Sequence, residues 1–417
     1  MNALSRPMFY AGFFLQKLLP GALGVIALPW LFRFAGDTAY KQYSLTQSLL
    51  GAVSTFTGAW LGQSMLRNIR SSGYDKRTLQ IFFWGLLACA IFASGIAIPA
   101  TRFGLIKVAS YKFAPIILAS IFLTLQSAIV PGIQAVGRHA MCVLSEVART
   151  IIPIACLSLI GRSRINGASI DDSIAIGAAV ALIFVLPPLF ATWRAARGVK
   201  YDPFLGSIPA FLAYGTPLSI YSGASLTLQY IVREGLARNV GANGGVGALL
   251  FVADLVQRML NAVTSPLIAS QVPRLVVYYT NGAINRVRRI VAGLQFFIIM
   301  FSALLIIMAM LWRRTAIHPG FTVLQLRCFI VFCLGGAALQ MTACAQKIIE
   351  LRGATMVVAT YMLYALGAAS FFSNVFPSGI EAACPGLYFP LSAFLLYALT
   401  NLRARKMLHA VLMPTEN

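Results

Sequence analysis

The chain has 417 residues, of which 59% are hydrophobic and only 11% are charged, and its mean hydropathy is +0.79. Soluble proteins are about 45–50% apolar and about 25% charged, so this composition excludes a soluble globular enzyme, a disordered protein and a coiled coil. A bilayer-spanning helix needs roughly 20 apolar residues, so the sequence can supply about twelve spans. These numbers predict an all-α polytopic membrane protein.

Apolar runs separated by short polar breaks predict twelve membrane spans. The first run is too long for the apolar region of a signal peptide, and eleven more follow it, so we interpret it as a span. The expected spans cover residues 8–32, 43–66, 79–99, 113–134, 140–160, 173–192, 207–228, 246–268, 290–312, 321–345, 355–376 and 386–402.

The net charge of +22 comes from 33 Lys and Arg against 11 Asp and Glu. Lys and Arg gather in the cytoplasmic loops of membrane proteins. One set of alternate loops holds 18 of these residues and the other set holds 11. We therefore expect both termini in the cytoplasm. Part of the excess of positive charge can serve to bind an anionic substrate. Nucleic acid, the usual partner of a basic soluble protein, is not expected.

A polar segment near the middle of the chain, residues 194–204, separates two sets of six spans. We expect an N-terminal six-helix bundle over residues 1–203 and a C-terminal one over residues 204–417. An even number of spans gives both halves the same orientation. They would then be pseudo-symmetric about an axis along the membrane normal, as in transporters built from parallel repeats, with the substrate bound between them.

Several classes of protein are disfavoured by what the sequence lacks. It has no G-x-x-x-x-G-K-[ST] loop for ATP, and its seven cysteines and three histidines show no metal-site spacing. We therefore expect no metal, no cofactor and no enzyme activity. A membrane glycosyl polymerase or ligase is the alternative from a different class, but it would need a long periplasmic loop. A major-facilitator transporter also has twelve spans, but its Gly-x-x-x-Asp-Arg pattern after span two is missing.

Six ionisable side chains fall within the expected spans, where a charge at the bilayer centre costs roughly 2.5–3.5 kcal/mol. Each of the two acids precedes an arginine by three or four residues, which puts both partners on one helix face and favours local ion pairs, Glu146 with Arg149 and Asp254 with Arg258. The other cations have no acid within a turn, although one near a span end can reach the membrane surface. The six are Lys17, Glu146, Arg149, Asp254, Arg258 and Arg327.

If the charged side chains within the spans do not pair with one another, they can instead line a cationic, water-filled cavity. Asp254, Arg258, Asn261 and Ser265 recur at intervals of four, three and four residues, so span eight carries a polar stripe. A net-positive cavity suits an amphiphilic anion, such as sugars linked through a diphosphate to a polyisoprenyl lipid, because arginine binds phosphate through its planar fork. The candidate substrate-binding residues are Lys17, Arg149 and Arg258.

Three short segments resemble one known family. They are the first hairpin, LFRFAGDTAYKQYSLTQSLLGAVSTFTGAWLGQSMLRNIRSSG at 31–73, the segment GRHAMCVLSEVARTI at 137–151, and FLAYGTPLSIYSG at 211–223, with Tyr214, Gly215, Pro217 and Leu218 matching a Tyr-Gly-x-Pro-Leu pattern. The sequence is similar to the Wzx-type O-antigen and polysaccharide flippases of the multidrug/oligosaccharidyl-lipid/polysaccharide (MOP) exporter superfamily. It departs from them where Val232 precedes Arg233, because the family often has an Asp there; Glu234 is the neighbouring acid that could substitute. It also departs where Lys41 follows Tyr40, because the family often has a Gly at that position.

The resemblance implies a MATE/MOP-like pair of six-helix bundles in the bacterial inner membrane. It also implies translocation of undecaprenyl-diphosphate-linked oligosaccharide repeat units by alternating access, for O-antigen, exopolysaccharide or capsule synthesis. Several family members are considered ion-coupled, which makes Asp254 and Glu146 candidate coupling residues. Expected partners are membrane lipids, a polysaccharide polymerase and a chain-length regulator.

Two alternatives come from the same superfamily. A cation-coupled multidrug exporter should carry more buried carboxylates and should not have a net-positive cavity. A lipid II flippase usually has two further spans.

Overall fold

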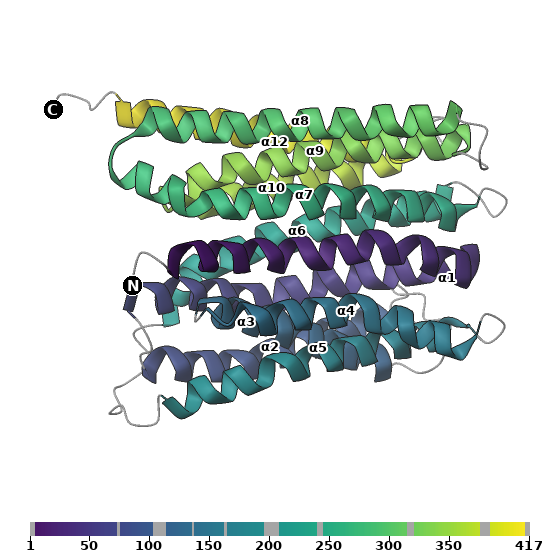
Figure 1. Cartoon of the computed structure of the whole chain (residues 1–417), viewed down its shortest axis with the longest axis horizontal. Coiled ribbons are helices and arrows are strands. Elements are labelled where there is room, and N and C mark those ends of the chain that lie inside the picture. The colour runs from purple at the N-terminus through teal and green to yellow at the C-terminus, as the bar shows by residue number, and fades with distance from the viewer. Residues whose placement is uncertain are drawn as a thin grey trace. The chain divides into compact units, whose positions relative to one another are not determined.

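The structure is a computed structural model of the whole chain, shown in Figure 1. It describes residues 5–72, 76–102, 114–135, 137–161, 165–195, 208–239, 245–314, 321–375 and 384–412. Within these ranges every regular element is an α-helix, as the composition predicts. The helices are α1 (Ser5–Ser72), α2 (Lys76–Arg102), α3 (Ala114–Ala135), α4 (His139–Ile160), α5 (Gly167–Ala195), α6 (Ile208–Asn239), α7 (Val246–Thr280), α8 (Ile284–Arg314), α9 (Val323–Leu351), α10 (Thr355–Val375) and α12 (Tyr388–Leu412).

The first helix, α1, contains the first two expected spans. Gly36 lies between them with φ 81° and ψ 176°, a conformation outside the helical region and accessible essentially to glycine alone. Two helices therefore meet at this residue, and the aromatic rings of Phe32 and Tyr40, from either side of it, pack edge to face at 5.4 Å. With α1 taken as two helices, each of the twelve expected spans corresponds to one helical segment of the structure.

The chain divides into two compact units, Met1–Tyr230 (unit 1) and Ile231–Asn417 (unit 2). This division falls inside α6, because the first part of that helix packs on α1. The boundary expected from the sequence, between residues 203 and 204, lies outside the described residues. The six-plus-six division of spans stays a prediction.

In unit 1, the second half of α1 packs closely against α3. Thr57 and Thr124 share a buried hydrogen bond of 2.9 Å between their hydroxyl groups, and the Ser127 hydroxyl donates to the Ser54 carbonyl oxygen at 2.9 Å. A Cβ atom added at Gly58 would collide with the Ser127 hydroxyl and the Thr124 carbonyl oxygen. The small residues of span two thus form a packing surface on which two membrane helices approach closely.

Buried side-chain hydrogen bonds link α3, α4 and α5 of unit 1. The Gln126 amide on α3 donates to the Ser145 hydroxyl on α4 at 2.8 Å, and Ser145 donates to the Ala181 carbonyl oxygen on α5 at 2.7 Å. Unit 1 also has a buried apolar core that includes Leu61, Phe82 and Ile129. Such side-chain hydrogen bonds help to hold membrane helices together, because lipid offers no alternative partners.

The first part of α6 lies against α1, and small residues allow the contact. The Ser219 hydroxyl reaches the carbonyl oxygens of Thr55 and Phe56, each at 2.8 Å. A Cβ at Gly215 would collide with the Trp60 carbonyl oxygen. The Tyr-Gly-x-Pro-Leu segment noted in the sequence thus includes the glycine that lets the two backbones approach.

In unit 2, α9 is the central helix and contacts α7, α8, α10 and α12. The end of α6 is fixed to α12 by the Tyr388 hydroxyl, which donates to the Val232 carbonyl oxygen at 3.1 Å. Helix α9 begins with a capping box, in which the side chains of Thr322 and Gln325 each accept from the other residue's backbone N–H.

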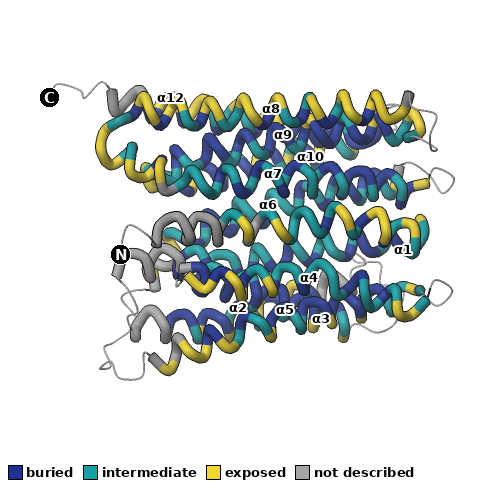
Figure 2. Tube along the Cα trace, viewed as in Figure 1, coloured by how far each residue is buried: buried dark blue, intermediate teal, exposed yellow. Residues whose placement is uncertain are grey.

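The outer faces of several helices are apolar and exposed, as expected for surfaces that contact lipid. Figure 2 shows exposed positions all along α8, and its large exposed side chains include Phe296, Met300, Leu304, Met308 and Trp312. Among the described residues, eight helices are long and apolar enough to cross a membrane, with the two halves of α1 counted as one. The chain is a multi-pass membrane protein.

The contact between α1 and α3 leads to a prediction on two glycines of one helix. Gly58→Ala should lower the free energy of unfolding by about 1–3 kcal/mol, because its methyl group meets the α3 backbone and overpacks the contact. Gly51→Ala is the matched control, since the nearest atom to its added Cβ is Leu226 Cδ1, an ordinary contact at 3.9 Å. Alanine favours helices by about 1 kcal/mol over glycine, so the control should be neutral or slightly more stable. Thermal unfolding midpoints of the purified variants in detergent would test this, and equal midpoints would contradict the packing described.

Candidate functional site

The charged groups of unit 2 are placed by α6 and α7. Helix α7 begins after Gly245, which adopts a left-handed conformation with φ 62°. This helix carries the polar stripe expected from the sequence, and it packs against α8 and α9. Because α6 continues to Asn239, its last three turns supply further polar side chains at the start of α7.

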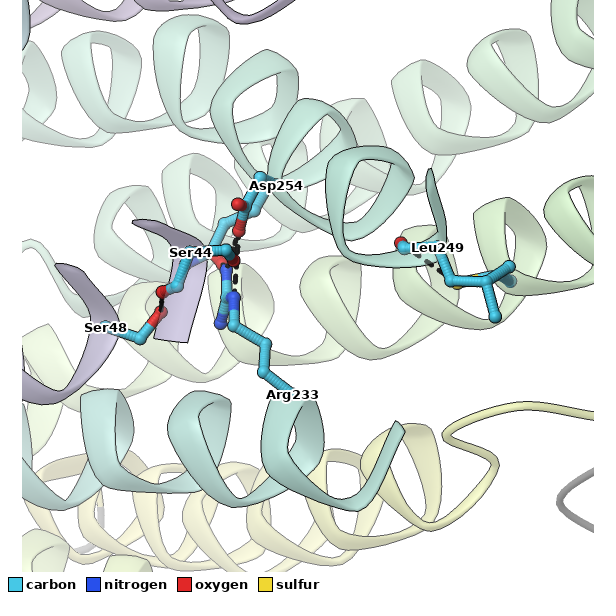
Figure 3. A network of polar contacts seen from close by, with 7 residues as sticks. Ser44, Ser48, Arg233, Leu249 and Asp254 are labelled. Carbon is cyan, nitrogen blue, oxygen red and sulfur yellow. Dashed lines mark hydrogen bonds and ion pairs between the residues drawn. The ribbon is translucent and has the colours of Figure 1, made fainter. Parts of the chain in front are cut away.

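Asp254 forms a buried ion pair with Arg233 of α6. Figure 3 shows the arginine side chain extending from α6 to the carboxylate on α7. The Arg233 Nε and Nη2 atoms donate to Asp254 Oδ1 at 2.8 and 2.7 Å, and Nη2 also donates to the Gln257 side-chain oxygen at 2.6 Å. The two charged side chains are only 5% and 12% exposed.

This pair corrects two expectations from the sequence. Asp254 does not form an ion pair with Arg258, although their spacing puts both on one face of α7. Spacing fixes the helix face only, and the Arg233 guanidinium approaches the carboxylate from the neighbouring helix with two donors. Arg233 therefore has an acidic partner. That partner is Asp254 of α7, whereas the family pattern has an Asp at the position of Val232. Glu234 does not substitute for that partner, because it pairs with Arg238 at 2.6 Å.

Arg258 on α7 is a cation without a partner in the described part of the chain. It is partly buried, and it forms no hydrogen bond or ion pair with any residue that the structure describes. It lies at the thirteenth position of the expected 23-residue span 246–268, near the middle of that span. An unpaired cation inside a membrane helix is costly, so it usually faces water or a charged ligand.

The rest of the stripe on α7 is joined to α9. The Gln340 amide on α9 donates to the Asn261 side-chain oxygen at 2.5 Å. Arg258 thus lies along the helix between two satisfied polar contacts, Asp254 with Arg233 on one side and Asn261 with Gln340 on the other. Arg258 is the charged member of this stripe for which the described residues supply no partner, so its guanidinium can bind a ligand.

In unit 1, the ion pair expected within α4 is present. Arg149 Nη2 and Glu146 Oε2 are 2.8 Å apart, with the side chains 38% and 19% exposed. An exposed arginine in an i,i+3 pair retains free donors, so Arg149 can still bind an anion. Lys17 lies in α1, but its side chain is outside the described residues, and its expected role remains a prediction.

Sequence reasoning missed three residues of these networks: Arg233, Gln257 and Gln340. The apolar run of span seven ends at residue 228, so the sequence predicts Arg233 in a loop. The helix continues to Asn239 and includes Arg233. Gln257 and Gln340 carry no charge and lie within apolar runs, so neither spacing nor hydropathy distinguishes them. Within the described ranges no group of three or more His, Cys, Asp or Glu residues gathers that could hold a metal ion.

Comparison with known proteins gives a match at the level of fold. No protein-family model matches the sequence, and no curated protein matches it. Several solved structures match nearly the whole chain. A MATE protein described as in the straight conformation has a TM-score of 0.67 and 12% identity, and covers 97% of this chain and 96% of its own.

Two other solved structures agree with this match. The eukaryotic MATE transporter AtDTX14 has a TM-score of 0.62 and 15% identity, over 97% of each chain. An outward-facing multidrug resistance MATE family transporter of the MOP superfamily has a TM-score of 0.64 and 12% identity, over 97% of each chain. The chain therefore has a MATE-type fold, as expected for the fold class. Identities this low show the fold alone.

Proposed function

We propose that the protein is a MOP-type transporter that flips undecaprenyl-diphosphate-linked oligosaccharide repeat units across the bacterial inner membrane, for O-antigen, exopolysaccharide or capsule synthesis. The observation that carries this proposal is Arg258, a guanidinium near the middle of an expected span that has no partner among the described residues. Its planar fork suits the oxygens of a diphosphate. The fold supports the transporter class, and the sequence resemblance supports the cargo.

In this proposal Arg258 is the main ligand of the diphosphate, and Arg149 and Lys17 are further cationic contacts. Asp254 and Glu146 are the candidate coupling residues. Each is held by an arginine in the structure, so binding a proton or metal cation would require that ion pair to break. Both termini lie in the cytoplasm, and a polysaccharide polymerase and chain-length regulator act on the product.

A cation-coupled multidrug exporter is the second candidate, because two of the similar solved structures are described as multidrug resistance MATE family transporters. Its cargo would typically be cationic, which an unpaired arginine would repel. The carboxylates at Asp254 and Glu146 are already engaged by Arg233 and Arg149, so they offer little free negative charge to a cationic drug.

Deleting the gene distinguishes the two candidates. If the protein is the flippase, surface polysaccharide should be lost and lipid-linked repeat units should accumulate, because the pathway stops before translocation. Polysaccharide by gel analysis and lipid-linked intermediates by mass spectrometry would measure this. Normal polysaccharide together with increased drug sensitivity would favour the exporter.

A further inference from the structure

Two adjacent tyrosines at the end of α7 each contact one arginine. One arginine is at the start of α8, and the other follows the end of α9. The guanidinium of Arg286, in the first turn of α8, lies over the Tyr278 ring at 5.4 Å from its centroid, within the range of a cation–π contact. Arg352, which follows α9, donates from Nε to the Tyr279 hydroxyl at 3.2 Å. We call these four residues the Tyr–Arg site. It lies at the end of unit 2 that the charge count assigns to the cytoplasm.

The arginines of this site have no carboxylate partner in the ranges that the structure describes. Both are exposed, and neither forms an ion pair with a described residue. The described residues of 245–412 include only two acids, Asp254 and Glu350. Asp254 is bound by Arg233, and Glu350 accepts from Lys347 Nζ at 2.7 Å and from the Gln346 amide at 2.5 Å. Both acids are therefore engaged, and the charge of the Tyr–Arg site is available to an external anion.

Further exposed cations lie close to the site in the sequence, on α7 and α8. They are Arg274 on α7 and Arg288 and Arg289 on α8. Arginines tend to lie on the cytoplasmic side of membrane proteins, and this tendency explains the number of arginines at this end of unit 2. It does not account for the tyrosine contacts, which fix the orientation of two guanidinium groups and so reduce the side-chain entropy lost when an anion binds.

Exposed apolar side chains lie close to the residues of this site in the sequence. Val276 and Val277, which precede the tyrosines, are 40% and 54% exposed. Met356, near the start of α10 and four residues after Arg352, is 60% exposed. Figure 2 shows exposed residues around the turn between α7 and α8. A ligand with a phosphate at one end and acyl chains at the other would match both the arginines and these apolar side chains. Tyrosine is itself common at the membrane–water interface.

We propose that the Tyr–Arg site binds the phosphate group of an anionic membrane phospholipid. The two guanidinium groups face the phosphate oxygens, and the acyl chains lie along Val276, Val277 and Met356. This lipid is a resident ligand, separate from the transported cargo proposed above, and the site requires both its charge and its tyrosine contacts.

Native mass spectrometry of the purified full chain tests this proposal with phosphatidylglycerol as the probe and phosphatidylcholine as the uncharged comparison. Wild-type protein should retain phosphatidylglycerol preferentially. Arg286→Gln with Arg352→Gln should weaken that binding by about tenfold or more, since each basic side chain near a membrane surface contributes substantially to the binding of anionic lipid.

The decisive variant keeps every charge. Tyr278→Leu with Tyr279→Phe removes the two contacts that orient the arginines, and it should weaken phosphatidylglycerol binding several-fold. Tyr361→Phe on α10 is the matched control and should bind as wild type does. Unchanged binding by the Tyr278/Tyr279 variant would overturn the proposal, because net charge alone would then explain retention. Selective retention of polyisoprenyl diphosphate in place of phosphatidylglycerol would also overturn it, in favour of cargo capture at this end.

Discussion

Arg233→Leu should sharply reduce the amount of folded protein in membranes. The substitution leaves the Asp254 carboxylate buried without its main partner, and breaking a buried ion pair in this way costs about 3–5 kcal/mol. The double variant Arg233→Leu with Asp254→Leu should recover most of this loss, because replacing both partners by apolar groups is often neutral. Size-exclusion profiles and thermal unfolding midpoints of a tagged protein would measure both effects.

An exposed ion pair on the same helix provides the control. Arg238 and Glu234 pair at 2.6 Å, but the arginine side chain is 70% exposed. Replacing both by leucine should change stability by less than about 1 kcal/mol, as is usual for surface ion pairs. If Asp254→Leu were rescued by removing Arg258 and not by removing Arg233, the pairing described here would be wrong.

Arg258→Ala should abolish most transport while the protein remains folded and abundant. The arginine has no partner among the described residues, so its removal leaves no charge uncompensated. A hydrogen bond to a charged group is worth about 1.5–3 kcal/mol, so the loss of substrate binding should be roughly ten- to hundredfold. Polysaccharide export by a deletion strain that carries the variant gene, normalised to membrane abundance, would measure this.

Arg258→Lys separates charge from geometry at the same position. Lysine keeps the charge but lacks the planar fork that binds two phosphate oxygens at once. Export should therefore be intermediate between wild type and Arg258→Ala. Wild-type export by Arg258→Ala would remove this residue from the proposed substrate site.

The fold could be predicted from the sequence because bilayer-spanning helices are determined by apolar length. Each expected span has a helix, but several helices extend well beyond the apolar run. Span seven was expected to end at residue 228, and α6 continues to Asn239. Its last turns are polar and are stabilised by Arg233, by the Glu234–Arg238 pair and by the Tyr388 hydroxyl bond to Val232. Hydropathy measures contact with lipid and does not register these interactions.

The candidate site could be predicted only in part. The i,i+3 spacing correctly predicted the pair of Glu146 with Arg149, since both partners lie on one helix. The same reasoning gave the wrong partner for Asp254, because the choice between Arg258 and Arg233 depends on how α6 packs beside α7. Contacts between helices distant in sequence, such as Asn261 with Gln340, are likewise set by packing, which spacing along one helix does not encode.

Translocation by the purified protein tests the central claim most directly. Proteoliposomes that contain the full chain and an undecaprenyl-diphosphate-linked oligosaccharide would be exposed to a membrane-impermeant glycosidase. Wild-type protein should make the inner-leaflet pool accessible to the enzyme, and Arg258→Ala should leave that pool protected. Protection of the inner-leaflet pool with wild-type protein, in vesicles where the same protein moves a fluorescent organic cation, would contradict the account and identify a drug exporter.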